Sequence, residues 1–216
     1  MSVYDLAVTD ALLTTTRAVR KRLNLTRPVP ESVIRDCLEI SLQAPTGANR
    51  QGWRWIVVTD ADTRRTLAEI YRKGADEYLN DGYRQAETDG AAQQVRVFDS
   101  ARYLSDHMAE VPVLVLPCIQ ILANMNEDPD VMWPSVLGSI LPAMWSFQLA
   151  LRARGLGSVY TTLHLNCAQE AAELLGIPDD IKQAGLLPVA YTLGTDFKPA
   201  KRRPLDEVLH WNGWQT

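Results

Sequence analysis

Apolar residues in the first half of the chain recur at three- and four-residue spacing, which is typical of helices that bury one face. Pro30 and Glu31 open one such segment, since proline suits the first helical turn and a carboxylate suits the positive end of the helix dipole. Asp60 is expected to cap another through its side chain. The spacing therefore predicts helices over residues 3–14, 31–42, 60–79 and 93–109, with a polar loop over residues 80–92.

Shorter runs that are rich in aromatic and β-branched residues predict strands. The segment Val111–Ile121 is almost continuously apolar, so we expect a strand that is buried on both faces of a sheet. Three further runs predict strands over Trp53–Thr59, Ser158–Thr162 and Leu186–Leu193.

The longest apolar run, Val136–Leu151, predicts a buried central helix over residues 135–154, preceded by a loop over residues 127–134. Pro142 lies inside this helix and removes a backbone donor, so we expect a kink or a break into two helices there. A short helix over residues 168–175 follows, and a last helical turn over residues 204–209.

Strands and helices that alternate loosely around one long helix favour an α+β fold, with helices around a mixed sheet. No internal repeat, low-complexity tract or linker divides the chain, so we expect a single domain over residues 1–216. The aromatic-rich segment 71–102 is expected to be either a lid over a site or ordinary helical packing, and both alternatives stay open.

Composition narrows the class of protein. The content of hydrophobic residues is 46% and that of charged residues is 22%, as in soluble globular proteins, and a net charge of −4 argues against nucleic-acid binding. Three widely spaced cysteines indicate reduced thiols. The start does not resemble a signal peptide and the apolar run at Val136 is too short and interrupted to span a bilayer, so we expect a cytoplasmic protein without a membrane segment.

The loop between the second predicted helix and the first predicted strand carries polar side chains in an unusual density. Thr46 offers a hydroxyl, and Asn49 and Gln51 each offer an amide with a donor and an acceptor. Such groups suit a flat ring system with alternating carbonyls and nitrogens. The alternative is an ordinary helix-to-strand turn, for which Pro45 and Gly47 are equally suitable.

Cations cluster near both ends of the chain, against an acidic background. Arg17 and Arg20 are spaced to share one side of a helical turn, and Lys201, Arg202 and Arg203 lie near the other end. Guanidinium groups match phosphate oxygens two at a time, so converging clusters would bind a phosphate; otherwise each is a solvated surface run. The chain has neither a Walker-type loop nor a G-x-G-x-x-G after a strand, which favours a mononucleotide held by side chains.

Four motifs in one order resemble the FMN-dependent nitroreductases. Members carry R-R-S-x-R, A-P-S-x-x-N-x-Q-P-W, G-L-G-S and K-x-R-x-P-like segments, and together the four counterparts extend over nearly the whole chain. These counterparts are residues 16–20, 44–53, 155–158 and 201–204. Ala18 replaces the usual serine, Gly52 replaces a proline, and Thr161-Thr162 stands where many members have two glycines.

The resemblance implies a three-layer α/β/α sandwich with a mixed, mostly antiparallel sheet, and an intertwined homodimer that binds two FMN molecules at the subunit interface. It implies that side chains near both ends and the backbone of Ala18 hold the FMN phosphate, and that the polar loop, often of the partner subunit, meets the ring. It also implies that a backbone segment approaches the flavin N5. The implied phosphate-binding residues are Arg17, Ala18, Arg20, Lys201 and Arg203. The implied loop residues at the ring are Pro45, Thr46, Asn49 and Gln51, and the implied backbone segment near N5 is Thr161, Thr162 and Leu163.

The implied activity is an NAD(P)H-dependent ping-pong transfer of hydride through flavin N5 to nitroaromatic or quinone-like acceptors, without a catalytic side chain. Reductive dehalogenation, flavin fragmentation, a deazaflavin-dependent reductase and a flavin-storage protein remain alternatives. Lys73 and Arg72 are candidates for the cation beside flavin N1. The tail over residues 205–216 carries Trp211 and Trp214, and we expect it to pack on the partner subunit. His164 and Cys167 alone make a poor metal site, so no metal is expected.

Overall fold

The central strand of the fold is β2 (Val113–Gln120), which is buried on both faces as its apolar sequence predicts. The computed structural model describes residues 3–122 and 128–214. The sheet has the order β1-β2-β5-β3, with β4 also paired to β2, and every strand pairing that the structure describes is antiparallel. The other strands are β1 (Trp53–Val58), β3 (Leu156–Ser158), β4 (Ile181–Gln183) and β5 (Leu187–Tyr191).

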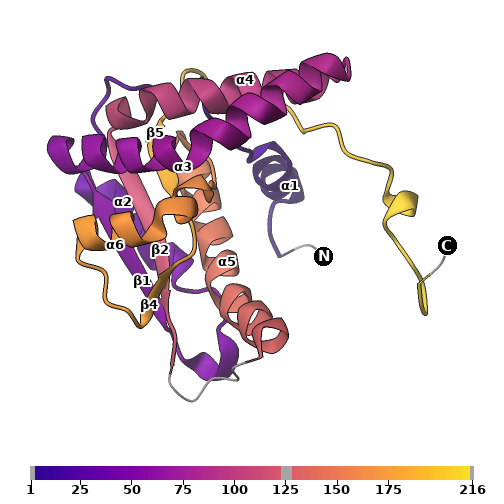
Figure 1. The fold of residues 1–216 in the computed structure, drawn as a ribbon. Coiled ribbons are helices and arrows are strands. Elements are labelled where there is room, and N and C mark those ends of the chain that lie inside the picture. Colours follow the sequence, from indigo (N-terminus) through magenta and orange to yellow (C-terminus); the bar gives the residue numbers. More distant parts are fainter. Residues whose placement is uncertain (1–2, 123–127, 215–216) are drawn as a thin grey trace.

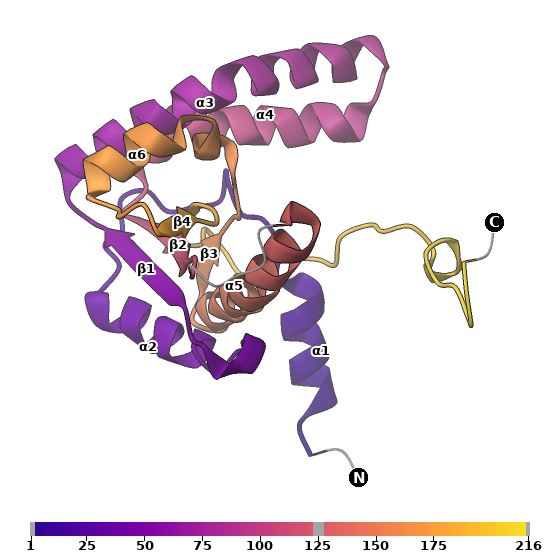
Figure 2. The ribbon, with the colours of Figure 1, turned by 60° about the horizontal axis from the view of Figure 1, so that its bottom comes forward.

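Alternate side chains of β2 enter two separate cores. Leu114, Leu116 and Cys118 pack beneath α3, α4 and α6, whereas Val113 and Val115 pack against α2 and α5 on the other face. Figures 1 and 2 show these three layers. The first group of helices is α3 (Ala61–Thr88), α4 (Ala92–His107) and α6 (Ala168–Leu175), and the second is α2 (Glu31–Ser41) and α5 (Pro129–Ala153). The predicted α+β sandwich is confirmed.

The expected loop over residues 80–92 is wrong, because α3 continues as a helix to Thr88. Gly82 does not interrupt it; an added Cβ there would lie only 2.3 Å from the Phe98 ring of α4. The small residue thus lets the two long helices approach closely. The turn between them comes at Gly90, whose φ of +64° is a conformation that glycine adopts readily.

The central helix α5 begins earlier than its apolar run indicates. Asp128 caps it by accepting a hydrogen bond from the backbone N–H of Asp130, so residues 129–134 are helical rather than loop, and residue 127 lies outside the described part of the chain. Of the two outcomes expected at Pro142, the break into two helices is wrong, since the helix runs on to Ala153, and the kink stays a prediction. By length and composition alone α5 could cross a membrane. Here its buried face packs against the sheet and α2.

The predicted strand over residues 158–162 is only partly present. Residues up to Ser158 belong to β3, and Thr161 forms an isolated bridge with Leu186. The short strand β4 was missed, because its sequence Ile181-Lys182-Gln183 is too short and too polar to show alternation. Pro117, which has no N–H, lies where β2 changes its partner from β5 to β4.

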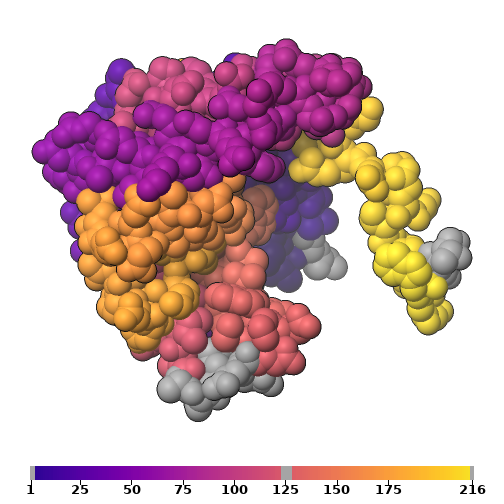
Figure 3. Space-filling view, in the orientation of Figure 1, coloured from indigo at the N-terminus to yellow at the C-terminus, as the bar shows by residue number. Residues whose placement is uncertain are grey.

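Both ends of the chain extend from the body of the protein. Helix α1 (Leu6–Thr15) has ten residues, all described, and none of them is buried. At the other end, the chain leaves the body beyond Phe197 and includes only one short helical turn, η4 (Leu205–Glu207). Figures 1 and 2 show α1 and this tail projecting, and the space-filling view in Figure 3 shows the tail standing clear of the body.

Candidate functional site

A cleft of about 360 Å³ lies where the segment 17–22 passes between α4 and the start of the C-terminal tail. Val19 anchors this segment, because its side chain is buried and its N–H donates to the carbonyl of Ser158 at 2.9 Å. The neighbours of Val19 therefore face outward. The cleft is lined by Arg17, Ala18, Arg20, Ser100 and Lys198, among others.

Two of the four cations in this segment are neutralised and two are not. Lys21 pairs with Asp99 at 2.6 Å, and Arg22 pairs with Asp196. Arg17 donates to the carbonyl of Lys198 at 3.0 Å, and Arg20 has only a 3.5 Å contact with the hydroxyl of Ser100. Within the described residues neither Arg17 nor Arg20 contacts a carboxylate, so the cleft carries a net positive charge.

Arg20 differs from the other cations in its burial. Burial lowers the pKa of its guanidinium, while the nearby Tyr71 raises it by a smaller amount. Tyr71 is buried to 2% exposure, which raises the pKa of its hydroxyl, and that hydroxyl lies 3.0 Å from the hydroxyl of Thr161. A half-buried positive charge without a counterion is costly, so this position suits an anion.

Tyr71 thus contacts Thr161 and lies near Arg20, two residues that were expected to bind different parts of the cofactor. In the sequence Tyr71 was only one aromatic residue of the segment 71–102, which was expected to be either a lid or helical packing. Nothing in the spacing of its residues indicated the contact with Thr161. Ser100 was missed for the same reason, because a single serine on a polar helix face carries no signal.

The segment that contains Thr161, Thr162 and Leu163 is rigidly seated. Thr161 exchanges two backbone hydrogen bonds with Leu186, and Leu163 begins the 3₁₀ helix η3 (Leu163–Cys167). An added Cβ at Gly74 of α3 would lie 2.4 Å from the carbonyl oxygen of Leu163, so this glycine permits the close packing. The structure thus places Thr161 against Tyr71, which interacts electrostatically with Arg20, and Thr162 and Leu163 follow directly in the chain.

His164 follows this segment and is fully buried. Burial lowers its pKa to about 4, and the nearby Gln183 offsets this only in part, since neither ring nitrogen has a well-formed hydrogen bond to a described residue. Lys73 pairs with Glu170 at 2.6 Å on the outer surface of α3, where it does not serve the cleft. Among the residues that the structure describes, no three His, Cys, Asp or Glu side chains gather as metal ligands.

Lys201 and Arg203 do not share the cleft with Arg17 and Arg20 in one chain. They line a separate, open hollow with Gln93 of α4. Gln93 and Ser100 lie about 10 Å apart along α4, at 1.5 Å per residue. Both cation groups therefore face the same helix, one to two turns apart.

The polar loop adopts a strained conformation. Ala48, Asn49 and Gln51 all have φ near +51°, a region that non-glycine residues rarely occupy. The loop is held by its own side chains, because Gln51 donates its backbone N–H to the Thr46 hydroxyl and its side-chain amide N–H to the side-chain oxygen Oδ1 of Asn49. Thr46 lines a cavity of about 330 Å³ against α5, and Pro45 is exposed just before it.

One chain does not bring this loop to the cationic cleft. The loop contacts Ser139 in the middle of α5, which accepts from Trp53 and Gly47, whereas Arg152 near the C-terminal end of α5 contacts Thr15 beside the cleft. The rise along the helix from Ser139 to Arg152 is about 20 Å. The two parts of the expected site are thus separated by more than three turns of α5.

Comparison with known proteins agrees with this architecture. The model of the Nitroreductase family matches residues 13–191. The chain is 28% identical to the NADH dehydrogenase of Thermus thermophilus, covering 90% of this chain and 94% of that one, and 29% identical to iodotyrosine deiodinase 1 of Rattus norvegicus over 84% of this chain. It spans only 62% of the length of the deiodinase.

Solved structures show the same fold. Oxidised iodotyrosine deiodinase bound to FMN and 3-iodo-L-tyrosine superposes with a TM-score of 0.72 at 24% identity, covering 95% of this chain and 99% of the other. The FMN and NADPH-dependent nitroreductase NfnB from sphigopyxis gives a TM-score of 0.67 at 19% identity, with the same coverage of both chains. Since the family model matches most of its length, the chain belongs to the nitroreductase family.

Proposed function

We propose that this protein is an FMN-dependent oxidoreductase that takes electrons from NAD(P)H and passes them to nitroaromatic or quinone-like acceptors. The observation that carries the proposal is the half-buried guanidinium of Arg20, which has no counterion among the described residues and faces a cleft beside Arg17. A phosphate monoester supplies the missing negative charge, so the residues present fit the headgroup of FMN.

In this proposal Arg17, Arg20 and the backbone of Ala18 hold the phosphate. The backbone of Thr161, Thr162 and Leu163 lies beside the ring, because Tyr71 ties Thr161 to the Arg20 side of the cleft. When bound, FMN supplies two-electron transfer at N5, in a ping-pong cycle that requires no acid–base side chain. The chain's own residues bind and orient the cofactor.

The proposal includes a homodimer in which the polar loop of a second copy completes the site. The exposed face of α5 carries Trp133, Leu141 and Trp145, each about two-fifths exposed, and α1 and the tail add further apolar surface. Large apolar surface of this kind is typical of an interface. A second copy seated there would place its residues Pro45, Thr46, Asn49 and Gln51 against the ring, and the tail with Lys201 and Arg203 would pack across the interface.

The hairpin of α3 and α4 is proposed to act as a lid over the site. Its base is fixed by Tyr71 in the core, but Tyr78 and Val97 farther along are about half exposed. A long hairpin with exposed apolar residues beside the cleft would shape acceptor choice. Ordinary helical packing is the alternative role.

The direct test is the absorption spectrum of the purified protein, followed by mass determination of the released chromophore. We expect a yellow protein that releases FMN and is bleached by NADH or NADPH under anaerobic conditions. Oxidation of the bleached protein by a quinone or a nitroaromatic at a steady-state rate would separate an enzyme from a flavin-storage protein. A protein that binds FMN but is bleached only by a reduced deazaflavin would overturn the NAD(P)H assignment.

Reductive dehalogenation is the second candidate. It is favoured by the 29% identity to iodotyrosine deiodinase 1 over 84% of this chain, although the chain spans 62% of that protein. Release of iodide from 3-iodo-L-tyrosine by the reduced protein, faster than reduction of a quinone, would favour this reaction. Formation of a fragmented flavin in the presence of oxygen would instead indicate flavin fragmentation.

A further inference from the structure

The C-terminal tail leaves the body of the protein at Phe197. Among the described residues it is the last apolar side chain that packs against either core. Two guanidinium groups lie over its ring, with the Cζ atom of Arg22 at 4.2 Å and that of Arg152 at 4.7 Å from the ring centroid. A cation over an aromatic face is an attractive arrangement, and here it is made twice.

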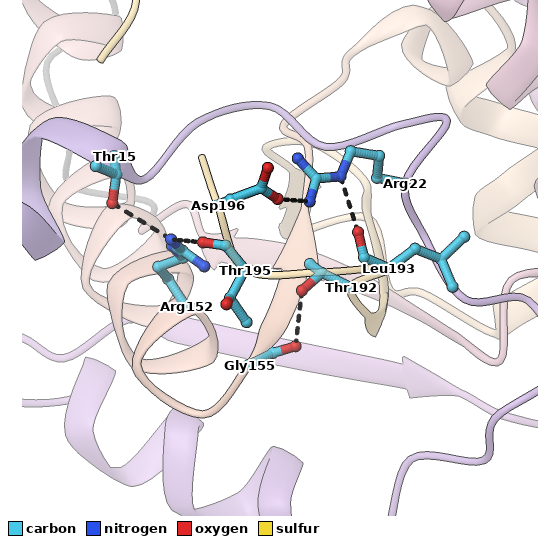
Figure 4. A network of polar contacts seen from close by, with 8 residues as sticks. All are labelled: Thr15, Arg22, Arg152, Gly155, Thr192, Leu193, Thr195 and Asp196. Atoms are coloured by element: carbon cyan, nitrogen blue, oxygen red, sulfur yellow. Dashed lines mark hydrogen bonds and ion pairs between the residues drawn. The ribbon is translucent and has the colours of Figure 1, made fainter. Parts of the chain in front are cut away.

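Hydrogen bonds fix both arginines to the backbone on the same turn of chain. Arg22 donates to the carbonyl of Leu193 at 2.8 Å and pairs with Asp196, while Arg152 donates to the carbonyl of Thr195 at 2.9 Å. Figure 4 shows the two side chains reaching this turn from different elements. Gly194 has a φ of +75°, and a Cβ there would lie 2.7 Å from a terminal nitrogen of Arg22, so a larger residue would displace the guanidinium.

Phe197 together with Arg22 and Arg152, which we call the clamp, lies directly beside the cationic cleft. Phe197 is followed by Lys198, whose carbonyl oxygen accepts the hydrogen bond from Arg17 at 3.0 Å. Within the described part of the chain the Arg17 side chain makes no other hydrogen bond or ion pair that would set its direction, and it is exposed. The position of the Lys198 carbonyl therefore decides where the Arg17 guanidinium points.

We propose that Phe197, held against Arg22 and Arg152, is a positioning residue for the anion cleft. It fixes Lys198, and through Lys198 it orients Arg17 toward a bound phosphate and sets the direction in which the tail with Lys201 and Arg203 departs. This inference rests on the proposed function. It predicts that the clamp serves the phosphate of the cofactor and not its ring.

The test compares FMN with riboflavin, which has the same ring and ribityl chain but no phosphate. Dissociation constants are measured by quenching of flavin fluorescence on the full chain freed of flavin. Phe197→Leu keeps an apolar side chain but removes the ring face, so we expect FMN affinity to fall about tenfold and riboflavin affinity to stay within twofold. Phe197→Tyr keeps the ring face and should keep the wild-type affinity for FMN.

Phe98→Leu is the matched control. Phe98 is also half-buried and packs on the same core, but its ring contacts that of Tyr78, and no guanidinium of the described residues lies over it. It should lower thermal stability without changing the ratio of the two dissociation constants. Arg152→Met provides a second route should Phe197→Leu fail to fold, since it removes one side of the clamp and should lower FMN affinity in the same selective way.

Two results would overturn the clamp. One is wild-type FMN affinity in both Phe197→Leu and Arg152→Met, and the other is an equal loss of FMN and riboflavin. Failure of the proposed function is distinct, because the wild-type protein itself would then bind FMN no more tightly than riboflavin. That result would remove the anion that the clamp is inferred to serve.

Discussion

At the scale of single residues, the local pairing of charges decides which cations are available to a ligand. The segment from Arg17 to Arg22 forms one basic cluster in the sequence, yet Lys21 and Arg22 form ion pairs with Asp99 and Asp196. Those acids come from α4 and from the turn before Phe197, so the spacing of the four cations alone does not show which of them form ion pairs. The motif did identify Arg17 and Arg20, and their shared cleft is what the structure adds.

Replacing Arg20 and Arg203 by alanine together should release the flavin without unfolding the protein. Charge-assisted hydrogen bonds contribute roughly 1.5–3 kcal/mol each, so the double variant should lose two to four orders of magnitude in FMN affinity. Thermal unfolding of the flavin-free forms should differ little between variant and wild type. Full flavin occupancy in the purified double variant would show that the phosphate lies elsewhere.

His164 should make the stability of the protein depend on pH. Its folded pKa is lowered to about 4 by burial, so between pH 6.5 and 4 the unfolded chain binds a proton that the folded chain does not. The free energy of unfolding should therefore have its full value above pH 6.5 and fall by about 3 kcal/mol as the pH drops to 4. Urea unfolding at several pH values should show this slope in the wild type and a flatter one in His164→Leu; equal slopes would contradict it.

At the scale of elements, helices with one apolar face were predicted in the right places, but their ends were not. The spacing located α2, α3, α4, α5 and α6, and the continuous apolar run located β2. The errors came where a residue acts through a distant partner. Gly82 looked like a helix breaker because its contact with Phe98 of α4 is invisible in the local sequence, and β4 exists because β2 offers a free edge beside Cys118.

Gly82→Ala should destabilise the α3–α4 hairpin, although alanine is the better helix former. The added methyl group would meet the Phe98 ring, and overpacking costs about 1–3 kcal/mol against roughly 1 kcal/mol gained in helix propensity. A thermodynamic cycle with Phe98→Leu, measured by chemical denaturation, checks this. The cost of Gly82→Ala should shrink in the leucine background, and an unchanged cost would show that the two residues do not interfere.

At the scale of the whole molecule, the prediction of a nitroreductase-like enzyme is confirmed by the family match over residues 13–191. The structure adds the position of the polar loop relative to the cleft. Within one chain the loop lies against the middle of α5 and the cleft lies near its C-terminal end, and α1 and the tail stand away from the body. The proposed homodimer accounts for both features, because a second copy would cover the exposed surface and supply the loop.

A mixed dimer tests whether the loop acts across the interface. Arg20→Ala disables the cleft of one copy, and Asn49→Gly removes the loop amide of the other while tolerating the positive φ. If the loop acts in the partner's site, a mixed dimer isolated with two affinity tags has one intact site and should bind flavin at about half the wild-type occupancy. The homodimer of each variant should bind flavin weakly. A mixed dimer that binds flavin as weakly as the two homodimers would show that the loop and the cleft of the same copy form one site.

The sequence by itself determined the fold class, the two-sided burial of β2, the family and the segments that carry polar and cationic side chains. These properties depend on spacing and local chemistry, which are present in the order of the residues. Only the tertiary structure decided which cations remain unpaired, that Tyr71 contacts Thr161 near Arg20, and that Phe197 packs against two arginines. Those contacts join residues that are far apart along the chain, and packing rather than local pattern brings them together.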